Sequence, residues 1–388
     1  MEAFLILRDT RVAIAGDRTE HADVASSSGR IRAIGTVPGK RGLDASGYLV
    51  LPGLVNAHDH LEFNLFPRLG AGPYESASAW ATDIHRRFTR EIEEVLATPL
   101  QERLVWGGIK NLVSGVTTVC HHNPWNRVFG SRFPVRVARS FGWAHSLEFA
   151  PDLRTRHAEC PETLPFVFHA GEAVNGAGER EMNTLADLGL FAANSVMVHA
   201  VGLTRDSLAL ARSRGCSVVW CPSSNVFTLG RTLPKYVLES DLPIALGTDS
   251  ALTAGGDMLD EIRFAQRISG LSDLKLYGMV ADGAARVLRL IHGEGTIQRG
   301  GVADLLLFRD RGLSPGQTLL SQTPEAVFIG GTLQLVSADL AARWRNSLLA
   351  IARFYTLKVE GRGEMFIRTR VPPLPPGLRM AGKQVTTV

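Results

Sequence analysis

Short apolar runs alternate with longer segments of helical spacing through the middle of the chain, from about residue 50 to 290. Each run ends in polar or histidine residues, a pattern typical of repeated βα units around a parallel sheet. The clearest strands are predicted at Tyr48–Val55, Val116–Cys120, Trp143–Leu147, Phe166–Phe168, Ser195–Val198, Ser217–Trp220 and Pro243–Leu246.

Four segments between these runs have the apolar spacing of helices. They are Pro99–Val113, Glu179–Leu188, Arg205–Arg214 and Asp257–Ile268. Thr98 is placed to cap the first of them, and Pro99 would occupy its first helical position.

The pattern at both ends of the chain differs from that in the middle, because short predicted strands are separated there by glycine and charged residues. Strands are predicted at Phe4–Leu7, Val12–Ala15, Gly29–Gly35, Ala303–Phe308, Val327–Ile329 and Met365–Arg370, with a helical stretch at about Ala338–Phe354. The simplest architecture is a barrel of βα units over residues 51–299. Residues 1–50 and 300–388 would then form a composite β-sandwich domain with a C-terminal extension.

Composition supports a folded chain and excludes several classes of function. The 388 residues are 45% apolar and 21% charged, which excludes disorder, and no apolar run approaches the length of about 18 residues that crosses a bilayer. The apolar stretch near the N-terminus is too short for a signal-peptide core, so a soluble, cytoplasmic protein is expected. The net charge of +4 comes from scattered arginines without a nucleic-acid-binding motif, so no nucleic-acid partner is expected. The four irregularly spaced cysteines indicate reduced thiols.

The strongest chemical signal is the pair His58 and His60, which follows an apolar strand. Residues at i and i+2 of extended backbone share one face, so both imidazoles can reach one ion. Catalytic groups of parallel barrels lie at the carboxyl ends of strands, where this pair falls.

Three further strands end in residues of the same chemical kind. His169 and Glu172 follow Phe166–Phe168, His199 follows Ser195–Val198, and Asp249 follows Pro243–Leu246. Imidazoles with a carboxylate suit a divalent ion such as Zn²⁺ or Fe²⁺ with a position left for water.

These motifs, in this order, resemble the amidohydrolase superfamily, nearest its cytosine deaminase-like branch, which includes guanine deaminase, S-adenosylhomocysteine deaminase and the triazine chlorohydrolases. The resemblance is carried by Pro52–His60, His169–Glu172, His199–Thr204, Cys221–Asn225, Leu246–Asp249 and Gly300–Leu305.

The resemblance implies a role for each residue. His58, His60, His169 and Asp249 would bind one divalent metal, most simply zinc, with iron as the alternative. Glu172 would pass a proton to the leaving group or ring nitrogen, and His199 would polarise the bound water or hold the substrate. Asp249 would also accept the proton that the attacking water releases.

Lysine usage favours a site with a single metal. Two-metal members of this superfamily bridge their ions with a carboxylated lysine, and the only lysine between His60 and His169 is Lys110, inside a predicted helix. Glu148, at the end of a predicted strand, is an alternative bridge.

Some features of the barrel and its rim stay open at this point. Seven clear strands are predicted where a complete barrel needs eight. Either Phe133–Val137 is the missing strand, or the barrel is distorted near its fourth strand. His121, His122 and His145 are as consistent with substrate contacts as with core packing.

The sequence therefore predicts a metal-dependent α/β hydrolase with a (β/α)8 barrel of the TIM type. The expected reaction is deamination of a small amino-substituted heterocycle by metal-activated water. Hydrolysis of a cyclic or linear amide, or of a halogenated ring, would use the same site, and a non-catalytic metal- or ligand-binding barrel is the alternative of another class. A homodimer is the default expectation, and no membrane partner is expected.

Overall fold

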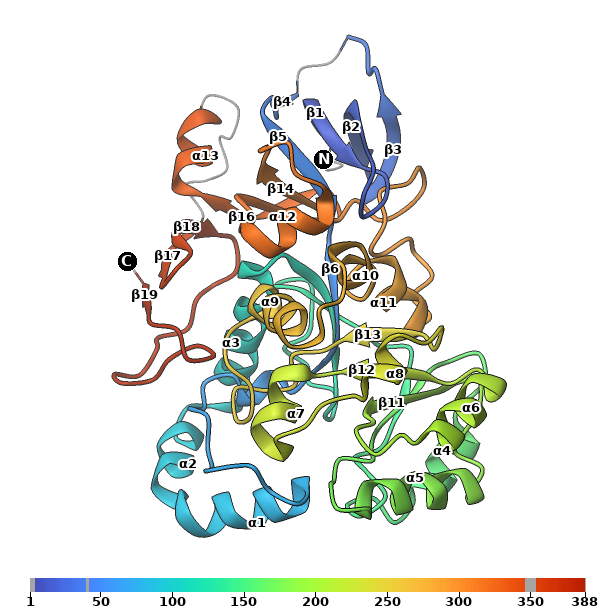
Figure 1. Cartoon of the computed structure of the whole chain (residues 1–388). Coiled ribbons are helices and arrows are strands. Elements are labelled where there is room, and N and C mark those ends of the chain that lie inside the picture. Colours follow the sequence, from blue (N-terminus) through green and yellow to red (C-terminus); the bar gives the residue numbers. More distant parts are fainter. Residues whose placement is uncertain (1–3, 40–41, 346–353, 388) are drawn as a thin grey trace.

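The computed structural model describes residues 4–39, 42–345 and 354–387. Strands from both ends of the chain pair in one eleven-stranded sheet, which runs from the top of Figure 1, where β1–β5 lie, to its left side, where β17–β19 lie. Its strands are β1 (Phe4–Ala13), β2 (Thr19–Ser27), β3 (Arg30–Gly35), β4 (Leu43–Asp44), β5 (Tyr48–Pro52), β14 (Leu305–Arg309), β15 (Ala326–Ile329), β16 (Thr332–Ser337), β17 (Tyr355–Val359), β18 (Gly363–Ile367) and β19 (Val385–Thr387). The contact between the ends is made by β5, which pairs with both β1 and β14.

The middle of the chain contributes eight strands in two parallel sheets. One contains β6 (Leu54–Asp59), β7 (Val116–His121) and β8 (Arg136–Val137); the other contains β9 (Gly142–Trp143), β10 (Phe166–Ala170), β11 (Ser195–His199), β12 (Ser217–Trp220) and β13 (Ile244–Leu246). A parallel bridge between Asp59 and Asp249 joins the end of β6 to the segment that follows β13. This bridge brings the carboxyl ends of the two sheets together.

Helices follow most of these strands, as the alternating pattern predicts. They are η1 (Leu61–Phe63), α1 (Ala77–Arg87), α2 (Thr89–Leu96), α3 (Leu100–Val113), α4 (Leu153–Glu159), α5 (Ala177–Asp187), α6 (Arg205–Arg214), α7 (Pro222–Leu229), α8 (Lys235–Leu238), α9 (Met258–Ser269), α10 (Asp273–Gly278), α11 (Asp282–Val287), α12 (Pro315–Ser321) and α13 (Ala338–Arg343). The four predicted helices are confirmed to within two residues at each end.

The predicted cap of α3 is wrong. Pro99 is itself the N-cap, with φ −52° and ψ 138°, so the helix begins one residue later, and the Thr98 hydroxyl has no hydrogen-bond partner within the described ranges. Three other helices among the described residues have reciprocal capping boxes, with Thr204 before α6, Asp257 before α9 and Ser314 before α12.

The single strand predicted over Tyr48–Val55 is two strands that belong to different sheets. The break falls at Gly53, where an added Cβ would lie 2.1 Å from Thr117 Oγ1. A glycine is required there because β5 and β6 diverge directly beside β7.

Other differences from the predicted elements are local. Trp143–Leu147 is a strand only at β9, which ends at Trp143, so His145 and Glu148 lie in the irregular segment beyond it. Strand β2 was not predicted because its polar residues hide the alternation. Of the helical stretch at Ala338–Phe354, α13 covers the first six residues, and residues 346–353 lie outside the described part of the chain.

The missing strand predicted within Phe133–Val137 is present as the two-residue β8. Residues 116–143 are all described, and no helix separates β7 from β8 or β8 from β9. A cavity of about 1200 Å³ lies where this shortened segment meets α3 and the C-terminal strands, and its lining contains none of the strand-end histidines. This hollow therefore lies away from the predicted site.

An ion pair ties β8 to the eleven-stranded sheet. Arg136 binds both carboxylate oxygens of Asp304, whose side chain is 2% exposed and also accepts from the Gly330 amide at 2.8 Å. We expect Arg136→Met to lower the free energy of unfolding by about 1–3 kcal/mol, because Asp304 loses its charged partner. Urea denaturation measures this, with Arg139→Met as the control. Equal losses in the two variants would contradict the assignment.

The C-terminal segment after β18 returns to the parallel sheets. The Ala381 amide donates to the Asn64 carbonyl at 2.8 Å, and the Gly256 amide donates to the Ala381 carbonyl at 3.0 Å. Burial raises the pKa of Asp257, but the charges of Arg362 and Lys383 outweigh it and lower that pKa overall. The segment is thus held by charge beside the strand ends.

None of the helices in the described ranges combines the length and the apolar character needed to span a bilayer.

Candidate metal centre

The two histidines at the end of β6 lie side by side. His58 and His60 are buried, and their ring centroids are 4.9 Å apart. The His60 amide donates to the Asp249 carbonyl at 2.8 Å, which fixes the backbone where β6 ends. The intervening Asp59 side chain turns instead to Lys110. The shared face expected from the i, i+2 spacing is present.

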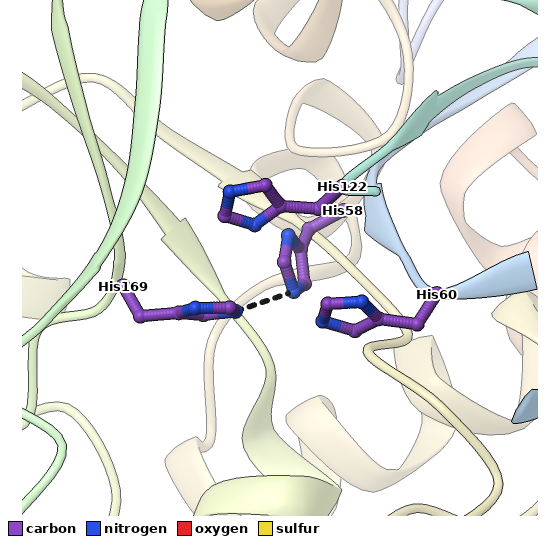
Figure 2. Close-up of side chains that lie close together, drawn as sticks. All are labelled: His58, His60, His122 and His169. Carbon is purple, nitrogen blue, oxygen red and sulfur yellow. Dashed lines mark hydrogen bonds between the residues drawn. The ribbon is translucent and has the colours of Figure 1, made fainter. Parts of the chain in front are cut away.

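His169, at the end of β10, and Asp249, after β13, complete the cluster. His58 Nε2 lies 3.3 Å from His169 Nε2, and Asp249 Oδ1 lies 3.6 Å from the Nε2 atoms of both His58 and His60. Figure 2 shows the imidazoles converging from different strands. The structure thus brings the four predicted ligands together.

The chemistry of these atoms fits a divalent metal ion. The Nδ1 of His169 lies 2.9 Å from the His145 carbonyl, to which it can only donate, so its Nε2 carries a lone pair toward His58. Burial, followed by the neighbouring histidines, lowers the pKa values of His60 and His169 well below 6.5, so these rings are neutral. A tetrahedral ion with ligands at about 2.0–2.1 Å spaces its nitrogen atoms about 3.3 Å apart, as His58 and His169 are spaced.

One carboxylate oxygen of Asp249 faces the histidines, and hydrogen bonds hold the other in place. Its Oδ2 accepts from the hydroxyls of Ser224 at 2.5 Å and Thr253 at 2.9 Å. Burial raises the pKa of Asp249, but its hydrogen bond to His58 and its electrostatic interaction with the neighbouring imidazoles outweigh it and hold that pKa well below 3.8. The carboxylate is therefore ionised and orientated, as a metal ligand requires.

Glu172 and His199 lie next to each other beside this cluster. His199 Nδ1 is 2.8 Å from Asn225 Nδ2, which donates to it, so the ring proton sits on Nε2, 3.6 Å from Glu172 Oε2. Burial, then the charges of Asp249 and Glu181, raises the pKa of Glu172 well above 4.5. A carboxyl group of this kind can hold a proton near neutral pH and transfer it within the site.

His122 joins the cluster although the sequence left its role open. Ring nitrogens of His58, His60, His122 and His169 all lie within 4.8 Å of one another, and a second group of the same tightness contains His58, His199 and Asp249. The only sequence signal for His122 was its place at a strand end. The remaining rim candidates lie outside both groups: His121 packs against Phe129, His145 is exposed, and Glu148 accepts a hydrogen bond from Ser78.

A buried polar network supports the cluster from behind. Lys110 Nζ lies 3.0 Å from Asp59 Oδ2 and donates to Asn64 Oδ1 and Thr248 Oγ1, each at 2.9 Å. Asn111 donates to Asp59 Oδ2 at 2.8 Å. Lys110 is therefore paired with the carboxylate of Asp59, which lies between His58 and His60 in the sequence.

Comparison with curated proteins finds deaminases. A 5-methylthioadenosine/S-adenosylhomocysteine deaminase of Halobacterium salinarum is 29% identical over 322 residues, which cover 66% of this chain and 73% of that protein. The protein of the same name from Caldanaerobacter subterraneus is 23% identical over 375 residues, covering 79% and 82%. No protein-family model matches the chain.

Solved structures show the same fold at lower identity. A triazine hydrolase variant superposes with a TM-score of 0.68 at 17% identity, covering 86% of this chain and 95% of that one. An adenosine deaminase from Xanthomonas campestris with bound zinc gives 0.60 at 21% identity, covering 88% and 98%. Atrazine chlorohydrolase from Arthrobacter aurescens, complexed with zinc, gives 0.67 at 16% identity, covering 85% and 95%. Together with the deaminase relatives, these matches confirm the resemblance to the amidohydrolase superfamily.

Proposed function

We propose that this chain, whose relatives and fold are those of the amidohydrolase superfamily, is a metal-dependent hydrolase that removes an amino group from a small heterocycle. One observation carries the proposal. The side chains of His58, His60, His169 and Asp249 converge, and beside them lie Glu172 and His199, which can hold and transfer a proton. The curated relatives are deaminases, which favours C–N cleavage over other hydrolytic reactions.

The proposed ligands of one divalent ion are the Nε2 atoms of His58, His60 and His169 with Asp249 Oδ1. Zinc is the first choice because solved structures of the same fold contain it, and iron is the second. When bound, such an ion allows water to lose a proton near neutral pH. A single ion is favoured because Lys110, the one lysine near the site, is paired with Asp59.

The protein residues would manage the protons of the reaction. Water adds its oxygen to the ring carbon that bears the amino group, and Asp249 accepts the proton that this water releases. Glu172 delivers a proton to the amino nitrogen, so the C–N bond breaks and ammonia leaves. His199 donates from Nε2 and orientates the reacting oxygen.

The barrel that would carry this site is also part of the proposal. Strands β6 to β13 follow one another in chain order, and the Asp59–Asp249 bridge supports closure of the two parallel sheets into a (β/α)8 barrel over residues 51–299. Residues 1–50 and 300–388 would form the composite β domain. The barrel would be distorted between β8 and β9, where regular strand pairing is interrupted.

Metal content tests the ligand assignment. We expect the purified protein to contain close to one equivalent of zinc or iron per chain, measured by elemental analysis, and His58→Ala to lose it because one of four donors is removed. His21→Ala, an exposed histidine of β2, is the matched control. Absence of metal from the wild-type protein, or metal retained in His58→Ala, would overturn the assignment.

Ammonia release tests the reaction. The metal-loaded protein is assayed with a panel of aminopurines, aminopyrimidines and pterins, and with amides and halogenated triazines for the alternative reactions. We expect ammonia from an amino-substituted ring. Release of halide, or of amine from an amide, would reassign the reaction, and a metal-loaded sample without turnover would favour a binding protein.

A further inference from the structure

His122, the first residue of the irregular segment after β7, packs directly against the histidines among the proposed ligands. It is fully buried, and its ring centroid lies 4.5 Å from that of His169, 4.9 Å from His58 and 5.7 Å from His60. Figure 2 shows one of its ring nitrogens directed toward the other three imidazoles.

The backbone fixes which nitrogen of His122 carries the proton. His122 Nε2 lies 2.9 Å from the Ala144 carbonyl, which can only accept, so Nε2 is the donor and Nδ1 has a lone pair. The next carbonyl along the chain, that of His145, fixes His169 in the same way through Nδ1 at 2.9 Å. Two successive carbonyls after β9 therefore set the tautomers of both rings. Carbonyl-anchored imidazoles are the usual form of metal-ligating histidine.

The other nitrogen of His122 has no partner among the described residues. Its Nδ1 is buried without a hydrogen bond, although a buried unpaired acceptor is costly in a folded protein. Packing alone does not explain why a histidine occupies this position. The His122 ring packs edge-on against Trp143, with 5.3 Å between the ring centroids, and a phenylalanine ring would make the same contact. Figure 2 shows a ring nitrogen of His122 directed toward the other imidazoles, and each of the four rings offers a nitrogen within 4.8 Å of the others.

We propose that His122 Nδ1 is a further nitrogen ligand of the ion that His58, His60, His169 and Asp249 bind, which gives the site five protein donors. The inference rests on the proposed metal-dependent function. A fourth imidazole favours an ion that accepts five or six ligands, so the protein should retain Co²⁺ or Fe²⁺ as well as zinc.

Zinc affinity tests the role of His122. The metal-free protein is titrated with Zn²⁺ in competition with a chromophoric chelator, for the wild type and for His122→Phe, which keeps a ring but removes both nitrogens. We expect binding to weaken by about tenfold to a hundredfold. The control is His121→Phe, the same substitution one residue earlier, where the ring faces Phe129 and its Nδ1 accepts from the Leu61 amide at 3.3 Å. The control should bind zinc as the wild type does.

A measurement on the wild-type protein keeps the test independent of how the variant folds. X-ray absorption of the Co²⁺-loaded protein counts its imidazole ligands, and we expect four. Three imidazoles together with unchanged zinc affinity in His122→Phe would overturn the role of His122 and leave the proposed function intact. A wild-type protein that binds neither ion would overturn both.

Discussion

Replacing Glu172 with glutamine is expected to lower kcat by about a hundredfold to ten-thousandfold while leaving the metal content unchanged. Glutamine keeps the size of the side chain but cannot take up and release a proton in this role. The carboxyl group lies 3.6 Å from His199 Nε2 and belongs to neither group of converging donor atoms, so the proposed ligands stay in place. Steady-state ammonia release and elemental analysis measure the two quantities.

Glu181→Gln is the matched control for this experiment. Glu181 is a neighbouring carboxyl group that accepts from the Gly171 amide at 3.2 Å, and burial, followed by the charge of Glu148, raises its pKa to about 7. Among the described residues, Glu181 belongs to neither group of converging donors. We expect a loss of less than tenfold. Equal losses in the two variants, or full activity in Glu172→Gln, would remove Glu172 from its proposed role.

The ends of the buried strands could be predicted from the sequence because an apolar run that stops at a histidine or aspartate is a local signal. His58, His169, His199 and Asp249 each follow such a run, and parallel strands place their carboxyl ends at one rim. Helix α6 was predicted to the residue, and in the structure Thr204 caps its start and Gly215, in the left-handed conformation, ends it.

The remaining features depend on contacts between distant segments, which a local pattern does not contain. The break at Gly53 has no signal in the apolar run around it, because its cause is the approach of Thr117 from the neighbouring strand. The proposed role of His122 depends on its hydrogen bond to the Ala144 carbonyl, which lies in a segment that the sequence pattern predicted to be a strand. The sequence predicted that Lys110 lies in a helix, but its pairing with Asp59 results from how the two segments pack and has no local signal.

The buried pair Lys110 and Asp59 carries the second large expected effect. Both side chains are at most 2% exposed, and the ammonium group lies 3.0 Å from Asp59 Oδ2. We expect Lys110→Met to lower the free energy of unfolding by about 3–5 kcal/mol, because the carboxylate is left buried without its countercharge. Zinc binding should weaken in the same variant, since Asp59 lies between His58 and His60 and also accepts from Asn64 at 2.8 Å. Urea denaturation and chelator competition measure these two effects.

A double variant separates the unpaired charge from the loss of the lysine itself. In Lys110→Met with Asp59→Asn, no charge remains to be buried, and the single oxygen of asparagine can still accept from one of the two amides, Asn64 or Asn111, that donate to Asp59. We therefore expect the double variant to be more stable than Lys110→Met alone, with a loss smaller than the sum of the two single losses. Additive losses would show that the two groups do not interact, and a Lys110→Met protein as stable as the wild type would remove the ion pair from the support of the site.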